Sequence, residues 1–227
     1  MRGAEILFED ADIIVVDKPA GMYVHRSPGH EEGTLAEELA ATRPGMLRSG
    51  SPERPGVVHR LDADTSGVMV FAKTPRAYAS LRKAFESHSG VEKVYLAVCH
   101  GAISPAEGTL ETRMGRKPWD PKRMAAEVPG GKLAVTHWTV LAKKGPLALV
   151  EFRIETGRMH QIRVHAAHLG HPVAGDPLYG NAQKDAGLRV RPSRTLLHAV
   201  ELSFNHPATG ERMTFAAHPP PEITYAV

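Results

Sequence analysis

The sequence contains a single cysteine, Cys99, among its 227 residues. One cysteine excludes an internal disulfide, and the lack of disulfides is typical of proteins from reducing compartments. The amino terminus, MRGAEILFED, lacks the apolar core of a secretory signal. No apolar run approaches the roughly 20 residues that span a membrane. These absences predict a soluble cytoplasmic protein with no membrane partner.

The chain also lacks a large excess of charge of either sign. The chain has 28 Lys and Arg against 25 Asp and Glu, a formal net charge of +3. This excess permits an anionic partner without demanding one, so only local clustering is informative. The chain also lacks a GxGxxG motif and a phosphate-cradling glycine loop, so we predict no cofactor.

Short apolar or alternating runs predict strands. The first, Ile13 to Val16, ends in the turn formed by residues 18–21. The other predicted strands cover residues 67–74, 92–99, 133–142, 147–154 and 196–204. A long loop rich in proline and glycine covers residues 43–56.

Two helices are predicted from their start signals. Thr34 and Glu37 fit a capping box, and Thr74 can cap a second helix that has Pro75 at its first position. Helices interspersed irregularly among strands favour an α+β fold around a mixed sheet. No domain boundary is evident, so we expect a single domain over residues 1–227.

The stretch VVHRLDADTSG, residues 57–67, carries two carboxylates two residues apart. It superficially resembles the aspartate motif of haloacid-dehalogenase-like phosphatases, which hold Mg²⁺. That motif closes an apolar strand, whereas His59 and Arg60 come directly before Asp62. It also needs a downstream acidic pair, and GDP at 175–177 supplies only Asp176. The phosphatase interpretation is therefore disfavoured, and no metal is predicted.

A plain turn is the alternative for the same stretch. Asp64, Thr65 and Ser66 are residue types that build turns. For Asp62 this interpretation is incomplete, because Arg60 lies two residues back and shares its face in extended chain.

Four histidines crowd a short segment, at His160, His165, His168 and His171. Their spacings do not match HExxH, and no glutamate is interleaved, so a zinc site is disfavoured. Phosphate-facing or structural histidines are the preferred interpretation.

Basic residues cluster around Trp119 in RMGRKPWDPKRM. They are Arg113, Arg116, Lys117, Lys122 and Arg123. A second group consists of Lys184, Arg189, Arg191 and Arg194. Such a cluster beside an aromatic residue suits a loop that lies on a phosphate backbone, and a solvated surface loop is the alternative.

Residues 92–99 alternate, so Tyr95 is expected on the face opposite Val94, Leu96 and Val98. This tyrosine fits two interpretations, a stacking residue at a site or a buried core tyrosine.

Together these segments resemble the RluA family of pseudouridine synthases. The resemblance rests on DKPAGMYVH, HRLDADTSG followed by FAKT, KVYLAV, GRMHQIRVHAAHLGHPVAGDPLYG and LLHAVELSFNHPATGERMTFAAHPP, in the expected order. It implies the pseudouridine synthase catalytic fold, with a mixed, largely antiparallel central sheet and flanking helices. It also implies isomerisation of specific uridines in ribosomal or transfer RNA, without a cofactor or a metal.

The resemblance assigns roles residue by residue. Asp62 is the catalytic aspartate, and Arg60 is associated with displacing and replacing the flipped base. Tyr95 stacks on the target base, and Arg163 pairs with the catalytic carboxylate. Lys18, Pro19 and Gly21 match the opening motif and are expected to shape the site. Residues expected to contact RNA are His59, His160, Gln161, Arg116, Lys117, Lys122 and Arg123.

Many family members carry a small amino-terminal RNA-binding domain before the opening motif. This chain begins directly at the catalytic part, as shorter members do, so RNA recognition is expected from the catalytic domain itself. We expect a monomer.

Overall fold

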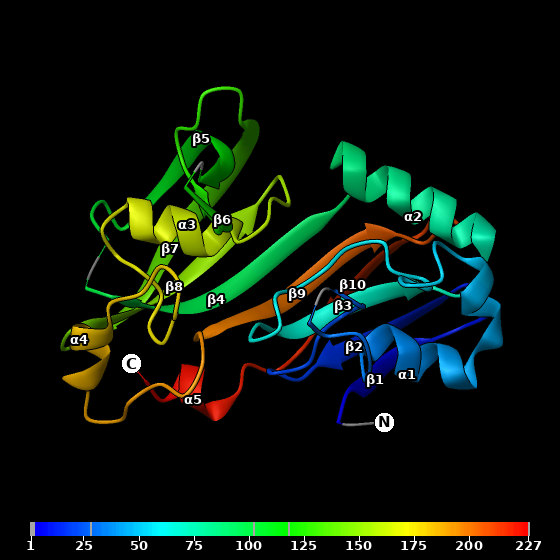
Figure 1. The fold of residues 1–227 in the computed structure, drawn as a ribbon, viewed down its shortest axis with the longest axis horizontal. Coiled ribbons are helices and arrows are strands. Elements are labelled where there is room, and N and C mark those ends of the chain that lie inside the picture. The colour runs from blue at the N-terminus through cyan, green and yellow to red at the C-terminus, as the bar shows by residue number, and fades with distance from the viewer. Residues whose placement is uncertain (1–2, 28, 102, 118, 227) are drawn as a thin grey trace. The chain divides into compact units, whose positions relative to one another are not determined.

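The computed structural model describes residues 3–27, 29–101, 103–117 and 119–226. The chain forms two compact units (Figure 1). Unit 1 consists of Met1–Glu92 and Ala199–His218, and unit 2 consists of Lys93–His198 and Pro219–Val227. The expectation that residues 1–227 act as a single catalytic domain stays a prediction.

Unit 1 is built on strands that pair mostly antiparallel. They are β1 (Glu5–Glu9), β2 (Ile13–Lys18), β3 (Ser66–Ala72), β9 (Leu197–Asn205) and β10 (Arg212–Ala216). Their order is β1-β2-β3-β9, and β10 pairs with β9. The register of the central pair sets Val15 opposite Val70. All residues of β3 are buried, as expected of a continuous apolar run.

Three helical segments accompany these strands (Figure 1). They are α1 (Leu35–Thr42), the 3₁₀ helix η1 (Pro44–Arg48) and α2 (Pro75–Ser87). Both predicted helix starts are confirmed. The Glu37 carboxylate accepts a hydrogen bond of 3.0 Å from the Thr34 backbone N–H, and the Thr74 hydroxyl accepts one of 3.2 Å from Ala77. These bonds satisfy backbone donors that a helix start leaves unpaired.

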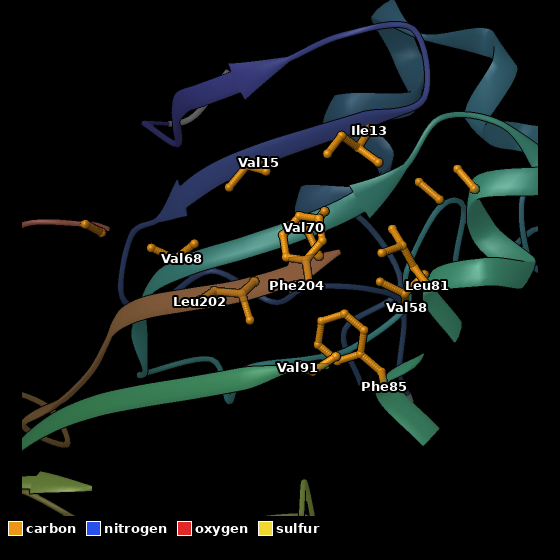
Figure 2. Close-up of a cluster of buried hydrophobic side chains, with 13 residues drawn as sticks. Ile13, Val15, Val58, Val68, Val70, Leu81, Phe85, Val91, Leu202 and Phe204 are labelled. Carbon is orange, nitrogen blue, oxygen red and sulfur yellow. The ribbon is translucent and has the colours of Figure 1, made fainter. Parts of the chain in front are cut away.

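The core of unit 1 joins the strands to α2 (Figure 2). Val68 and Val70 of β3 pack with Phe204 of β9, and Leu81 and Phe85 reach the same cluster from α2. Each large apolar side chain that is fully buried contributes about 1.5–3 kcal/mol by removal from water. This core fixes the strand that directly follows residues 57–65.

Gly67 is required where β3 passes β9. Its φ is +117°, and a Cβ added there would lie 2.2 Å from the Ala199 carbonyl oxygen. Any larger residue would push the two strands apart, so this glycine closes the turn that follows Asp62.

Unit 2 has a second set of antiparallel strands. They are β4 (Glu92–His100), β5 (Glu107–Lys117), β6 (Asp120–Ala125), β7 (Lys132–Lys144) and β8 (Leu147–Ile154). Their order is β4-β8-β7-β5-β6. The helices are α3 (Gln161–His168), α4 (Ala182–Ala186) and α5 (Pro221–Thr224). Val164 of α3 packs on Met114 of β5 and Ala134 of β7.

The predicted α+β class with a largely antiparallel sheet and flanking helices is confirmed, and the predicted strands all occur. The structure corrects the expectation that the basic segment around Trp119 is a loop. Strands β5 and β6 pair antiparallel there, from Gly115 opposite Ala125 to Lys117 opposite Asp120. Strands β1 and β10, which the sequence pattern missed, carry mostly exposed or half-buried side chains.

Glu9 of β1 links three parts of unit 1. Its carboxylate accepts hydrogen bonds from Arg43 at 2.8 and 2.6 Å and from Lys73 at 2.6 Å. The hydrogen bond from Arg43 is the main cause that lowers the Glu9 pKa from 4.5 to about 2, against the opposing effect of partial burial.

We predict that Glu9 contributes stability that acid removes. Because its pKa is lowered on folding, this contribution is complete above pH 4.5 and is lost as the pH falls towards about 2. Glu9→Gln should therefore have a lower free energy of unfolding than the unchanged protein at neutral pH. Its free energy of unfolding, measured by urea titration at several pH values, should fall less steeply as the pH is lowered. Glu86→Gln, which removes an exposed pair with Arg82, is the control and should change little. If the free energy of unfolding fell equally steeply with acid in the Glu9 variant and the unchanged protein, the assignment would be wrong.

Candidate functional site

The stretch 57–67 forms a turn ahead of β3. The Thr65 backbone N–H donates to the Asp62 carbonyl oxygen at 3.1 Å, and Thr65 and Ser66 are buried. Asp62 and Asp64 are half-buried. Asp64, Thr65 and Ser66 thus lie in the predicted turn, and the Asp62 side chain stands at its start.

Lys18 anchors this turn from the end of β2. The side chain is fully buried, and its Nζ donates to the carbonyl oxygens of Pro19, Met22 and Ala63 at 2.8, 2.9 and 2.9 Å. The Gly21 backbone N–H donates to the same Ala63 oxygen at 2.9 Å. The carbonyl groups offset the cost of burying the ammonium group. The opening motif therefore holds the backbone at Ala63, between Asp62 and Asp64.

His59 is held inside unit 1. Its Nε2 accepts a hydrogen bond of 3.1 Å from the Val70 backbone N–H, and its ring stacks on Phe85 with centroids 4.5 Å apart. These contacts fix the course of the chain just before Arg60, whose side chain is exposed. They give His59 a structural role, while its predicted RNA contact stays a prediction.

Tyr95 lies in β4 of unit 2 and is buried, with 8% of its surface exposed. Lys93 lies two residues earlier and is also buried. Its Nζ lies 3.5 and 3.4 Å from the carbonyl oxygens of Glu155 and Thr156. Burial, together with the charge of Arg158, lowers the Lys93 pKa from 10.5 to about 8. The sequence pattern did not single out this lysine.

Arg163 of α3 has a carboxylate partner within unit 2. Its Nε and Nη2 donate to the two carboxylate oxygens of Asp176, both at 2.7 Å, and both side chains are buried. One Asp176 oxygen also accepts from the backbone N–H groups of Leu178 and Tyr179 at 2.8 and 3.0 Å. Burial opposes ionisation of Asp176, but the hydrogen bonds and charge of Arg163 outweigh it and lower the pKa of the carboxyl.

Asp176 is the residue that the sequence pattern undervalued. GDPLYG belongs to the motif that carries the family resemblance, yet nothing in its spacing indicates an arginine as partner. The predicted pair of Arg163 with Asp62 involves residues of different units and stays a prediction.

His160 and Tyr179 tie the start of α3 to the β5–β6 hairpin. The Tyr179 hydroxyl accepts from the Met124 backbone N–H at 2.8 Å and lies 2.8 Å from His160 Nδ1. The Tyr179 hydroxyl thus bridges the backbone of β6 and the ring of His160. His160 adopts a left-handed backbone with φ of +57°.

The side-chain amide of Gln161 makes four hydrogen bonds within unit 2. Its carbonyl oxygen accepts from the Thr156 hydroxyl and the Arg158 backbone N–H, and its amide nitrogen donates to Val135 and Thr136. An amide offers two donors and two acceptor positions, so these bonds argue against the predicted RNA contact.

The crowded histidines do not form a metal cluster within the described ranges, where no group of three or more His, Cys, Asp or Glu could hold an ion. His165 is fully buried between the hydroxyls of Thr112 and Thr136, at 3.0 and 2.9 Å. Burial is the main cause that lowers its pKa to about 4, and His168 adds to the shift. The structural interpretation thus fits His165.

The predicted RNA-binding cations lie on the β5–β6 hairpin. Arg116 and Lys122 are exposed, and Lys117 and Arg123 are half-exposed. Trp119 is 82% exposed and stands among them. The hairpin therefore presents an aromatic ring beside positive charges, as the sequence predicts.

A family model described as RNA pseudouridylate synthase matches residues 12–168. The chain belongs to the RluA family of RNA pseudouridine synthases. It is 44% identical over 225 residues to ribosomal large subunit pseudouridine synthase D of Neisseria meningitidis serogroup A, covering 96% of this chain and 59% of that protein. It is 41% identical over 219 residues to an uncharacterised RNA pseudouridine synthase of Synechocystis, covering 95% of this chain and 65% of that protein.

A solved structure agrees with this membership. Human RNA pseudouridylate synthase domain containing 1 aligns with a TM-score of 0.78 and 28% identity, covering 99% of this chain and 86% of that one. The chain thus spans about three fifths of the length of the first curated relatives and most of this solved one. Among the described residues, no helix is long and apolar enough to cross a membrane.

We predict that the Lys18 anchor can be broken selectively. Lys18→Met keeps the side-chain length but removes three charge-assisted hydrogen bonds, so the free energy of unfolding should fall by about 2 kcal/mol or more. The amide hydrogens of Gly21 and Thr65 should then exchange faster with solvent than those of β3. Lys83→Met on the exposed face of α2 is the control. Unchanged exchange at Gly21 and Thr65 in Lys18→Met would show that the anchor does not hold the turn.

A second prediction concerns Asp176. Asp176→Asn leaves the buried Arg163 charge without its carboxylate, which should cost about 3 kcal/mol of stability at neutral pH. Because folding lowers the Asp176 pKa, the unchanged protein should lose this advantage as acid protonates the carboxyl, and the variant should not. Urea unfolding at several pH values measures both. Glu222→Gln, which removes a half-exposed partner of Arg194, should change little, and a similar loss in the two variants would contradict the prediction.

Proposed function

We propose that this chain isomerises uridine to pseudouridine in RNA, with Asp62 as the catalytic residue. The match of the family model over residues 12–168 is the observation that carries the proposal. The matched range contains HRLDADTSG, and the Lys18 anchor holds the backbone beside Asp62. A residue on an anchored turn at the start of a buried strand suits chemistry that needs a fixed carboxylate.

The isomerisation requires a carboxylate next to the ribose of the target nucleotide. The bond from C1′ to N1 of uridine breaks, the uracil turns, and C1′ joins C5, so no atom is gained or lost. Positive charge develops on the ribose as the bond breaks, and a carboxylate beside the sugar stabilises it. Asp62 can act by attack on C1′ or by removal of the proton at C2′. A base then takes the C5 proton.

The other proposed catalytic roles follow the family pattern. Arg60 takes part in displacing the target base, and Tyr95 stacks on it. Arg163 pairs with the catalytic carboxylate and so favours its charged form. The bidentate pair with Asp176 supports this role indirectly, because it fixes the plane of the Arg163 guanidinium group.

We propose RNA as the partner and ribosomal RNA as the substrate class, with transfer RNA as the alternative. The Neisseria meningitidis relative is named a ribosomal large subunit pseudouridine synthase, which supports this order. The hairpin cations and Trp119 suit contact with a phosphate backbone and with unstacked bases. Such contacts offset the few kcal/mol that flipping a base requires. We further propose a cytoplasmic monomer that needs no cofactor.

The test is nucleoside analysis of RNA after incubation with the purified chain. Asp62→Asn should lower the rate of pseudouridine formation about a thousandfold or more, because the amide cannot act as base or nucleophile. Asp64→Asn is the matched control, since it changes the neighbouring acid of the same turn, and it should keep most of the rate. Pseudouridine formed at the normal rate by Asp62→Asn would overturn the proposal.

The same experiment distinguishes an enzyme from a protein that only binds RNA. A chain that binds RNA but forms no pseudouridine, with or without Asp62, would be an RNA-binding module that keeps only the fold. Mapping pseudouridine in total RNA from cells with and without the gene then identifies the uridine.

A further inference from the structure

Lys93 of β4 is a buried lysine whose hydrogen bonds are long. Only 8% of its surface is exposed, and its Nζ lies 3.5 and 3.4 Å from the carbonyl oxygens of Glu155 and Thr156. Hydrogen bonds from nitrogen to oxygen usually measure about 2.7–3.2 Å, and an ammonium group has three N–H donors. Since these two oxygens are its acceptors in the described part of the chain, one donor of Lys93 is left over.

The charge of Lys93 costs stability at neutral pH. Burial, with the charge of Arg158 added, lowers its pKa from 10.5 to about 8. Folding thus disfavours the charged form, so the cost is complete below pH 8 and is relieved as the pH rises from about 8 to 10.5. Lys18 differs, because its Nζ has three carbonyl oxygens at 2.8–2.9 Å. An anchoring role therefore explains Lys18 well and Lys93 poorly.

Open space lies beside the Lys93 ammonium group on the side of Gly157. This glycine is exposed, and its φ lies outside the left-handed region, so the backbone does not require a glycine there. A Cβ built on it would lie 3.8 Å from Lys93 Nζ and, its chain neighbours aside, within 4 Å of no other heavy atom of unit 2 among the described residues. An exposed residue without a side chain thus leaves a way for an acceptor atom to reach Nζ.

Lys93 shares a face of β4 with Tyr95, the residue proposed to stack on the target base. Alternate residues of a strand point to the same side and lie about 6.6 Å apart. The pairing of β4 with β8 is regular from Val94 to His100, so no bulge interrupts the alternation at Tyr95. A base stacked on Tyr95 therefore has its edge within reach of a side chain as long as lysine.

We propose that the Lys93 ammonium group donates a hydrogen bond to a carbonyl oxygen of the target uracil and stabilises the negative charge of the detached ring. The proposal rests on the proposed function and adds a catalytic residue to it. When the C1′–N1 bond breaks, its electron pair stays on the uracil and spreads over the two carbonyl oxygens. The electrons return to a bond when C5 joins C1′, after which C5 loses a proton to a base and N1 gains one. Lys93 keeps its own proton throughout, and a donor aimed at a charge that exists only during the reaction raises kcat more than it strengthens binding.

The rate of pseudouridine formation tests this role. Lys93→Met keeps the length of the side chain but not its charge, so it should lower kcat about a hundredfold and change KM less than about threefold. Lys143→Met, on the exposed part of β7, is the matched control and should keep the normal rate. Equal kcat values for the two variants would overturn the proposal.

Blocking the open side of the ammonium group is an independent test. Gly157→Ala places a methyl group 3.8 Å from Nζ without demanding an unusual φ, so the variant should fold normally and lose about tenfold in kcat. Gly187→Ala is the control, since Gly187 is also exposed and has φ of −81°. A normal kcat in Gly157→Ala would show that no acceptor approaches Lys93 from this side, and the assignment would be wrong.

The pH profile shows whether the charge itself acts. Because kcat/KM reports ionisations of the free enzyme, it should fall in the unchanged chain as the pH rises through about 8, where Lys93 loses its proton. Lys93→Arg stays charged, so its kcat/KM, relative to its own maximum, should remain level across this pH. Arg158, Glu155 and Tyr95 lie beside Lys93 and are the same in both chains, so a difference between the profiles belongs to residue 93. An equal alkaline fall in both chains would refute the role of the charge.

Unfolding measurements need no turnover and show whether Lys93 is only an anchor. Because its buried charge costs stability, Lys93→Met should have a free energy of unfolding at neutral pH equal to or above that of the unchanged chain. Lys18→Met should lose stability under the same conditions. A loss in Lys93→Met as large as in Lys18→Met would make Lys93 an anchor and end the proposal. If no chain forms pseudouridine, the proposed function fails, whereas this comparison still reports on Lys93.

Discussion

One buried ammonium group holds the candidate site of unit 1 together. The Lys18 Nζ lies within 2.9 Å of three carbonyl oxygens. Two of them belong to the turn after β2 and the third to the turn before β3, 45 residues further along the chain. Pro19 and Gly21 fit this arrangement, because proline restricts the backbone and Gly21 has φ of +82°. The order of residues in DKPAG follows from the need to surround one charge.

Unit 2 contains a similar arrangement around a buried negative charge. The Asp176 carboxylate receives two bonds from Arg163 and two from the backbone of Leu178 and Tyr179. Tyr179 then connects to His160 through its hydroxyl. In each unit a fully bonded buried ion fixes the backbone around a residue with a proposed catalytic role. Buried ions need such complete sets of partners to be tolerated.

The parts of the fold that could be predicted from sequence are those with local signals. Thr74 before Pro75 marks the start of α2, and the apolar run Gly67–Ala72 marks a strand buried on both faces. The paired ends of the β5–β6 hairpin lacked such a signal, because residues 115–117 and 120–123 are mostly polar or basic and do not alternate with apolar ones. The division into two units is equally hidden, since unit 1 takes one segment from each side of unit 2.

For the site, the sequence motifs predict candidate residues but not the contacts that their side chains make. The motifs single out Asp62, Arg60, Tyr95 and Arg163 as candidates, and their roles stay predictions. A motif also does not name the partner of each side chain. The bidentate partner of Arg163 lies 13 residues away, across the end of a helix, where no periodic rule applies. Gln161 matches HQIR equally well, yet its amide is turned inward. Hydrogen-bond partners depend on tertiary contacts, which the pattern of types does not contain.

The formal net charge of +3 does not describe where positive charge lies on the chain, which bears on the proposed binding of RNA. Several cations are paired within the chain, as Arg43 and Lys73 are with the single carboxylate of Glu9 and Arg194 is with Glu222. The exposed arginines at 54, 60, 189 and 191 form no ion pair among the described residues. Other exposed cations, such as Lys83 on α2 and Lys143 on β7, lie on regular elements. An anionic strand responds to this local field over a Debye length of about 8 Å at physiological salt, so charge placement decides binding more than the total does.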